Sequence, residues 1–391
     1  MRCFHLSRRI TSTDLCGTGM QVNLSELKDV VRCSKLKKNV IVYMTKHILK
    51  TRWVIMKNIL VTGGAGYIGS HTTVELLESG YNVICVDNFS NSSEKVFDVI
   101  NDLTGKQCTW YNVDVCNIEE LDKIVAAHDV NCAIHFAGYK AVGESVGFPL
   151  MYYQNNINST LSLCEVCLKN NVRSIIFSSS ATVYGPPQYL PLDEKHSLSA
   201  TNPYGNCKLF IEQILKDVNV AHPALNIALL RYFNPVGAHG SYRLGERPKG
   251  IPNNLMPYIC QTALGVRQEL RIFGNDYDTI DGTGVRDFIH VVDLAKGHVA
   301  AIKKMEADPG CFVYNLGTGN GTSVLELVNT FMEVNGVDVP YVIAPRRVGD
   351  IAACWANPEA AKKHLGWEAQ YTIEDMVRDS WEAQKALGVY T

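Results

Sequence analysis

The sequence predicts an α/β protein with a doubly wound parallel sheet, followed by a smaller mixed α/β region. Three observations lead to this prediction. Short apolar runs alternate with amphipathic segments from residue 57 onward, a glycine-rich turn follows the first run, and the alternation ends near residue 236. The composition of the 391 residues, 46% hydrophobic and 19% charged, excludes disordered, collagen-like and coiled-coil proteins. No apolar run reaches the roughly 18 residues of a membrane-spanning helix, so we expect no membrane insertion.

Six apolar runs rich in β-branched and aliphatic residues are predicted to be strands of a sheet covered on both faces. They are Asn58–Thr62, Asn82–Val86, Thr109–Val113, Cys132–Phe136, Ser174–Ser178 and Ile227–Tyr232. Helical periodicity predicts helices at about Gly69–Ser79, Ile118–His128, Tyr153–Lys169 and Tyr204–Val218. Gly80 follows the first helix, where a left-handed cap is expected. Gly, Pro, Asn and Asp punctuate the later chain, which indicates a smaller second domain at 237–391 with some elements returning to the first domain at 56–236.

Charge separates the first 55 residues from the rest of the chain. Residues 1–55 carry 11 Lys and Arg against 3 Asp and Glu, whereas the remainder holds 26 basic and 36 acidic residues. The acidic body and the net charge of −2 argue against nucleic acid as a partner. Arg2, Arg8 and Arg9 give the leader a faint likeness to a mitochondrial presequence, and a targeting or docking element is one alternative. We expect instead a disordered or non-native extension upstream of a natural start at Met56.

The 13 cysteines are odd in number and scattered, and no signal-peptide core precedes them. We therefore expect no disulfide framework and a reducing, cytoplasmic location. Cys164 and Cys167 form a Cys-x-x-Cys pair, but no second Cys or His pair lies nearby to complete four zinc ligands. The 11 histidines are also dispersed, so no metal site is expected.

The first predicted strand runs directly into a turn with the spacing Gly63-x-x-Gly66-x-x-Gly69, and a helix follows. Gly63 suits a tight turn, Gly66 lets the backbone approach a pyrophosphate, and Gly69 permits close packing of helix on strand. The helix N-terminus then offers N–H groups and a positive dipole end to the phosphates. Asp87 ends the second strand, where its carboxylate accepts from ribose hydroxyls and repels a 2′-phosphate. These features predict a Rossmann-like domain that binds NAD rather than NADP.

Three further residues suggest acid/base chemistry. Ser180 follows the fifth predicted strand, and Tyr204 and Lys208 lie four apart on one face of a predicted helix. The lysine ammonium and a nicotinamide cation would lower the tyrosine pKa from about 10. Such a tyrosine takes a proton from a sugar hydroxyl while a hydride passes to NAD. A Tyr-x-x-x-Lys spacing is common by chance, but its place after the dinucleotide turn favours this interpretation.

Four long motifs carry a resemblance to a known family. They are His135-Phe-Ala-Gly-Tyr-Lys-Ala-Val-Gly-Glu-Ser145, Phe177-Ser-Ser-Ser-Ala-Thr-Val-Tyr-Gly185, Leu230-Arg-Tyr-Phe-Asn-Pro-Val-Gly-Ala-His239 and Gly250-Ile-Pro-Asn-Asn-Leu-Met-Pro-Tyr258. With them, the chain from about Met56 to its end resembles the extended short-chain dehydrogenase/reductases, and among these the UDP-glucose 4-epimerase family.

The resemblance implies that Tyr204 is the general acid/base, Lys208 its electrostatic partner and Ser180 an assisting hydroxyl. It implies NAD contacts at Gly63, Gly66, Tyr67, Ile68, Gly69, Asp87, Asn88, Asn91, Ser92, Asp114, Val115, Phe136, Ala137, Lys140, Asn155, Ser178, Tyr204, Lys208 and Tyr232. It implies substrate contacts at Lys140, Ser180, Thr182, Tyr204, Asn234, Asn254, Leu255, Arg271, Phe273, Arg286, Arg347, Asp350 and Cys354. Two of these arginines suit the two charges of a diphosphate.

The resemblance further implies that UDP-galactose and UDP-glucose are interconverted. The sugar is transiently oxidised at C4 to a 4-keto intermediate, which rotates and takes the hydride back on its other face. NAD would stay tightly bound and be regenerated in each cycle, UDP-sugars would be the partners, and the family is typically homodimeric. Cys354 is small where a tyrosine in some relatives closes the space for an N-acetyl group. We therefore expect UDP-GalNAc and UDP-GlcNAc as further substrates.

Two alternatives remain open. The first is another UDP-sugar-modifying member of the superfamily, either a pentose-nucleotide epimerase or a decarboxylase; a 4,6-dehydratase would need an acidic pair where Ala181-Thr182-Val183 stands. The second is a catalytically silent nucleotide sensor, which predicts loss of the tyrosine or the lysine. Both Tyr204 and Lys208 are present.

Overall fold

The central sheet of the computed structural model has seven parallel strands. The structure describes residues 57–347 and 349–388, so the predicted basic extension at 1–55 and the start at Met56 lie outside the described residues. The strands are β1 (Asn58–Thr62), β2 (Asn82–Asp87), β3 (Thr109–Asn112), β4 (Cys132–His135), β5 (Ser174–Ser180), β6 (Asn226–Tyr232) and β11 (Cys311–Leu316). Their order across the sheet is β11-β6-β5-β4-β1-β2-β3. The chain adds strands outward from β1 to β3 on one side and then from β4 to β11 on the other, so the strand order reverses between β1 and β4. This is the topological switch of a doubly wound sheet, and it confirms the predicted fold class.

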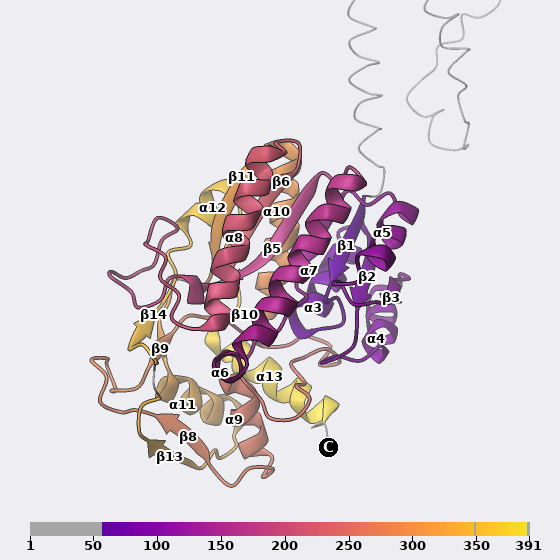
Figure 1. Cartoon of the computed structure of the whole chain (residues 1–391). Helices are drawn as coiled ribbons and strands as arrows, with labels where there is room; N and C mark the ends of the chain where they lie inside the picture. The colour runs from indigo at the N-terminus through magenta and orange to yellow at the C-terminus, as the bar shows by residue number, and fades with distance from the viewer. Residues whose placement is uncertain (1–56, 348, 389–391) are drawn as a thin grey trace, which may run out of the picture. The chain divides into compact units, whose positions relative to one another are not determined.

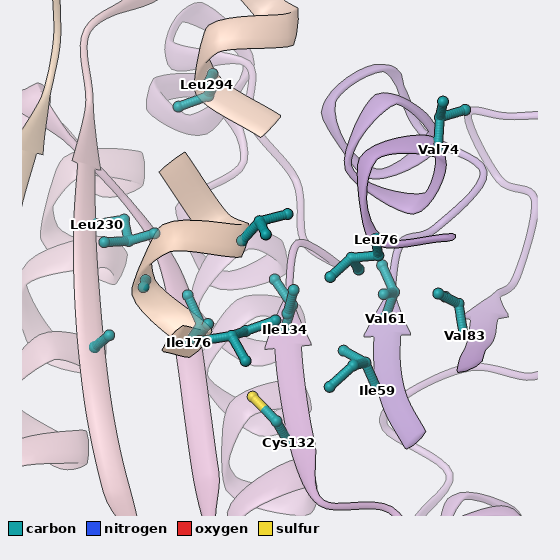
Figure 2. Close-up of a cluster of buried hydrophobic side chains, with 14 of the residues drawn as sticks. Ile59, Val61, Val74, Leu76, Val83, Cys132, Ile134, Ile176, Leu230 and Leu294 are labelled. Carbon is teal, nitrogen blue, oxygen red and sulfur yellow. The ribbon is translucent and has the colours of Figure 1, made fainter. Parts of the chain in front are cut away.

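Helices cover both faces of this sheet (Figure 1). The helices on one face are α3 (Tyr67–Glu78), α4 (Lys95–Thr104), α10 (Val291–Ala307) and α12 (Glu359–Leu365), and those on the other are α5 (Ile118–Ala127), α7 (Pro149–Lys169) and α8 (Pro203–Ala221). Alternate residues of each strand point to opposite faces. Ile59 and Val61 of β1 therefore join the first apolar cluster, part of which Figure 2 shows, whereas Leu60 joins the second.

The structure contains all six predicted strands and all four predicted helices, with ends that shift by a few residues. β5 continues to Ser180 rather than ending at Ser178, and α7 begins at Pro149. Gly80 has a φ of +87°, as expected of a left-handed cap. Helix α4 and the seventh strand, β11, were not predicted from the sequence. That strand arrives from the irregular part of the chain and pairs with β6, a long-range contact that local patterns do not encode.

The smaller region is built from short strands and three helices. The strand pairs are β7 (Asn234–Val236) with β10 (Phe288–His290), and β8 (Leu270–Phe273) with β13 (Tyr341–Ala344); β9 (Val285–Arg286) lies between β12 (Thr322–Ser323) and β14 (Ala353–Cys354). The short helix α6 (Val142–Gly147) belongs to the larger region, where it packs on α7 and α8, and the helices of the smaller region are α9 (Leu255–Ala263), α11 (Val324–Asn335) and α13 (Ile373–Leu387). Met256, Phe331 and Trp381 belong to the core that the last three helices share with β8. None of the described helices is long and apolar enough to cross a membrane.

Candidate functional site

The glycine-rich turn between β1 and α3 packs tightly against its neighbours. Gly63 has a φ of +72°, and its N–H donates to the carbonyl of Val86 at 2.7 Å. A Cβ on Gly63 would lie 2.8 Å from the Ala137 nitrogen, and a Cβ on Gly69 would lie 2.2 Å from the Gly63 oxygen. Gly66 is the N-cap of α3 and supplies no side-chain acceptor to the first N–H groups of the helix. The turn therefore requires glycine at two positions and presents backbone donors at the third.

Asp87, at the end of β2, is hydrogen-bonded to the backbone of this turn. Its Oδ2 accepts from the Ala65 N–H at 3.0 Å, and its Oδ1 accepts from the Phe89 N–H at 2.9 Å and the Ser92 hydroxyl at 2.8 Å. A carboxylate offers about four acceptor positions, so it can bind a further donor from the cavity it lines. The predicted ribose acceptor is thus held in one orientation by the backbone of the turn.

A cavity of about 1100 Å³ lies beside the turn, at the carboxyl ends of the parallel strands. Every residue for which the resemblance implies an NAD contact lines it, from Gly63 to Tyr232 at the end of β6. The Asn88 amide donates to the Asp114 carboxylate at 3.0 Å and joins the rims of β2 and β3. The predicted residues come from motifs far apart in the sequence, and the fold brings them to one cavity because parallel strands have their carboxyl ends at one edge of the sheet.

The far side of the cavity comes from a loop that sequence analysis did not assign to NAD. This loop, residues 243–253, lies between β7 and α9. Its Arg243 pairs with Asp102 of α4 at 2.9 Å, and its Lys249 donates to the Phe89 carbonyl at 3.0 Å. The part of the loop before the motif at Gly250 is marked only by its Gly and Pro, which indicate a loop but do not indicate what the loop covers.

Glu246 of this loop is a site residue that the sequence did not reveal. Its Oε1 accepts from Lys140 at 3.1 Å and from the Asn254 amide at 2.6 Å. Sequence analysis assigned both donors to the substrate. The structure therefore brings Lys140 and Asn254 together across more than a hundred residues through one carboxylate.

α8 begins where the candidate acid/base residues lie. Asn202 caps the helix by accepting from the Gly205 N–H at 2.9 Å, and Pro203 takes the first helical position, where its missing N–H costs nothing. The Tyr204 N–H donates to the Ser145 hydroxyl of α6 at 3.2 Å. The cap and this bond hold the first turn of α8 against the cavity.

Ser180, Tyr204 and Lys208 lie together as predicted. The Lys208 Nζ is 5.7 Å from the centre of the Tyr204 ring and 4.7 Å from that of Phe177. It donates to the carbonyl of Ser178 at 2.6 Å, which ties α8 to the end of β5. Ser180, two residues later, lies beside the Tyr204 hydroxyl and favours its ionised form. The phenol and the ammonium thus line the cavity, with the serine hydroxyl next to the phenol.

Burial dominates the electrostatics of this group. It raises the pKa of Tyr204 to about 12, and Ser180 opposes this only in part. The lowering expected from a nicotinamide cation beside the phenol stays a prediction. Burial also lowers the pKa of Lys208 to about 8. The reason is that both side chains are enclosed by the protein, and burial penalises the charged form of each. The phenol therefore holds its proton firmly unless positive charge lies close to it.

A second group of predicted residues gathers away from the turn, on the short strands. β14 runs parallel to β9 with Cys354 opposite Arg286. The Arg347 guanidinium lies 4.8 Å from the centre of the Phe273 ring and pairs with Asp350 through bonds of 2.8 and 3.2 Å. Burial lowers the pKa of Arg286, and the nearby Asp350 counteracts that shift. Two guanidinium groups and one carboxylate thus form a polar group, none of which lines the large cavity.

The remaining predicted substrate residues are more dispersed. The Thr182 hydroxyl donates to that of Ser180 at 3.0 Å, so this residue belongs with the acid/base group. Asn234 is the exposed first residue of β7, and Leu255 is the first residue of α9. Arg271, on β8, is largely exposed and lies 3.7 Å from Glu269, and within the described residues it forms no hydrogen bond or ion pair with the other predicted residues.

Comparison with known proteins shows which family this chain is similar to in sequence and in fold. The model of the NAD dependent epimerase/dehydratase family matches residues 59–317. The UDP-glucose 4-epimerase of Bacillus subtilis is 56% identical over 328 residues, which cover 84% of this chain and 97% of that protein. The crystal structure of UDP-glucose 4-epimerase from Bifidobacterium longum in complex with NAD+ and UDP has a TM-score of 0.82 and 55% identity, and covers 84% of this chain and 98% of that chain. The UDP-Glc/GlcNAc 4-epimerase of Campylobacter jejuni has a TM-score of 0.75 and 35% identity, with 84% and 99% covered.

Proposed function

The chain belongs to the NAD dependent epimerase/dehydratase family, and on that premise we infer that it is an isomerase that interconverts UDP-galactose and UDP-glucose with NAD as its cofactor. The observation that carries this conclusion is that Tyr204 and Lys208 line the same cavity as the glycine turn, with Ser180 beside Tyr204. We also propose that residues 56–236 hold mainly the cofactor and residues 237–391 mainly the UDP-sugar.

The residues present fit NAD. The bare N-terminus of α3 at Gly66 suits a pyrophosphate, and the anchored Asp87 suits the ribose hydroxyls of an unphosphorylated adenosine. A Cβ at Gly63 or Gly69 would fill the turn. When bound, NAD supplies an acceptor for the hydride from sugar C4 and returns it later in the same cycle. The nicotinamide end belongs near Ser178 and Tyr232, at the carboxyl ends of β5 and β6.

We assign proton transfer to Tyr204. Its phenolate oxygen takes the proton of the sugar C4 hydroxyl when the 4-keto intermediate forms, and the resulting phenol gives the proton back when that intermediate is reduced. Because burial raises the pKa of Tyr204 to about 12, the phenolate needs positive charge beside it, and the Lys208 ammonium provides this charge. Ser180 lies beside the Tyr204 oxygen and favours its ionised form.

The second group suits the nucleotide end of the substrate. Arg286 and Arg347 oppose the two charges of a diphosphate, with charge-assisted bonds of about 1.5–3 kcal/mol each. Asp350 accepts from the uridine ribose once Arg347 turns toward the diphosphate. Firm binding of the nucleotide lets the sugar remain loosely held, as the rotation of the 4-keto intermediate requires.

We further propose that UDP-GalNAc and UDP-GlcNAc are substrates. Cys354 is a small side chain that is 7% exposed and lies opposite Arg286 in the β9–β14 pair. A Cys354→Tyr variant should retain the UDP-galactose reaction and lose at least about tenfold in kcat/KM for UDP-GalNAc, since a bulky ring fills the space of an acetamide. Cys354→Ser, which keeps the volume, is the control. Equal loss on both substrates would show that Cys354 does not set specificity.

A homodimer and a cytoplasmic location complete the proposal. Leu161 on α7 and Phe210 on α8 are 45% and 47% exposed, and Phe210 stacks on Tyr153 with ring centres 6.1 Å apart. Exposed apolar side chains on two packed helices are typical of a surface that a second copy covers. Light scattering should give twice the mass of one chain.

The function is tested by product analysis with UDP-galactose, without added NAD. Conversion to UDP-glucose by the purified protein is the expected result, because a regenerated cofactor needs no second redox substrate. No conversion, even after NAD is supplied, would refute the proposed activity and favour a nucleotide sensor.

A further inference from the structure

A fully buried ion pair lies behind the candidate acid/base residues. Glu212 of α8 and Arg231 of β6 are 0% and 1% exposed. The Arg231 guanidinium binds the Glu212 carboxylate in a bidentate manner, with Nε donating to Oε1 at 2.8 Å and Nη2 donating to Oε2 at 2.6 Å. The Ser179 hydroxyl donates to the same Oε1 at 2.6 Å. Ser179 is also the register partner of Arg231 across β5 and β6, so the pair joins two strands and one helix.

The network continues beyond the ion pair and leaves its polar groups satisfied. Arg231 Nη1 donates to the Tyr184 hydroxyl at 3.0 Å, which donates to Asn315 of β11 at 2.6 Å. The Asn315 amide donates to the Leu192 carbonyl at 2.9 Å. Burying two charges costs much of what their attraction returns, and apolar replacements are often as stable. Stability alone therefore does not account for this pair.

The spacing along α8 suggests what the pair does. Tyr204, Lys208 and Glu212 are four residues apart, so they lie on one face of the helix. They face the three consecutive serines that end β5: Lys208 donates to the Ser178 carbonyl, Glu212 accepts from the Ser179 hydroxyl, and Tyr204 lies beside Ser180. Hydrogen bonds thus join the helix to the strand at two successive turns, and the inner one is made by the carboxylate of the ion pair.

We propose that Glu212 and Arg231 are a positioning pair that sets the separation of Tyr204, Lys208 and Ser180 during proton transfer. The inference rests on the proposed function of that trio and deepens it. The pair acts through α8 and the ends of β5 and β6, without touching the substrate.

Glu212 also acts on the charge of Lys208. The titratable groups that face this ammonium are Tyr204, Cys207 and Glu212 from α8 and His135 from β4. Burial keeps the first two protonated, with pKa values of about 12 and 11, and keeps His135 neutral with a pKa of about 3. The bonds from Arg231 lower the pKa of Glu212 and keep it ionised. Within this set Glu212 is the negative charge that favours the ammonium form of Lys208.

The test compares Glu212→Gln and the milder Ser179→Ala with the wild-type holoenzyme. In Glu212→Gln we expect kcat for UDP-galactose to fall by about 10- to 100-fold with KM and NAD content nearly unchanged. The alkaline limb of the kcat–pH profile should move down by about one pH unit, because Lys208 loses its favourable charge. Ser179→Ala, which removes one bond and no charge, should lower kcat less and leave the profile in place.

Asp293→Asn is the matched control. This α10 carboxylate is 1% exposed and accepts from the Gln370 and Tyr371 N–H groups at 2.7 and 2.9 Å, and it forms no hydrogen bond or ion pair with the described side chains of the trio. An equal fall in kcat in the control, or a fall in Glu212→Gln that only follows the folded fraction, would overturn the proposal. The Lys208 pKa, read by NMR of 13C-labelled lysine, provides a readout that needs no turnover. An inactive wild type would refute the proposed function, whereas an unmoved Lys208 pKa and unmoved kcat in Glu212→Gln would refute the positioning pair.

Discussion

Replacing Gly69 by alanine should displace α3 from the dinucleotide turn. The new Cβ would lie 2.2 Å from the Gly63 oxygen and 3.0 Å from two further backbone atoms of the turn. Backbone atoms cannot rotate away as a flexible side chain does, so the helix must move by about 1 Å. Overpacking of this kind costs about 1–3 kcal/mol of unfolding free energy. It also moves the N-terminal N–H groups of α3 away from a bound pyrophosphate.

The assay measures NAD released from the purified protein on heating, together with unfolding in urea. We expect NAD retention to weaken by about 10- to 100-fold, since misplacement by 1 Å is felt at this level. Gly143→Ala is the control, because Gly143 lies in α6 with no heavy atom within 4 Å of its added Cβ. Full NAD occupancy and an unchanged unfolding free energy in Gly69→Ala would refute the steric argument.

Three further predictions concern the same cavity. Tyr204→Phe should lower kcat by about 100-fold or more and leave bound NAD unchanged in the heat-release assay, and a smaller loss would place the proton transfer elsewhere. Asp87→Asn should weaken NAD and strengthen NADP in a binding titration, because the repulsion of a 2′-phosphate disappears; an unchanged ratio of affinities would contradict the assignment. The pKa of Lys208 is about 8 in the fold against 10.5 in the unfolded chain, so its charge lowers the free energy of unfolding in full below pH 8. This destabilisation becomes smaller as the pH rises toward 10. The unfolding free energy of NAD-free wild type relative to Lys208→Met should therefore rise from pH 7 to pH 10, and a flat difference would mean that burial does not lower the Lys208 pKa below its unfolded value.

Much of the cofactor half could be predicted because its signals are local. A strand, a turn and a helix follow one another within a dozen residues, so the glycine spacing at Gly63 to Gly69 already constrains the backbone. Asp87 ends the second strand, and the topology of parallel sheets places strand ends at one edge. The acid/base trio was found for the same reason, as Tyr204 and Lys208 are one helical turn apart.

Other features depended on contacts between distant segments. β11 joins the sheet from far along the chain, and Glu246, which lies outside the four motifs, meets Lys140 from a distant loop. Neither contact leaves a periodic pattern in the sequence.

The sequence by itself determined the order of strands and helices along the chain, the glycine turn and the candidate acid/base side chains, because each rests on neighbouring residues and backbone preferences. Only the tertiary structure decided the surroundings of those side chains. Burial raises the pKa of Tyr204, and the enclosed pair of Glu212 and Arg231 lies directly behind the trio. Both effects depend on how much water the fold excludes and which charges it brings near, and these are properties of packing between segments that are remote in the chain.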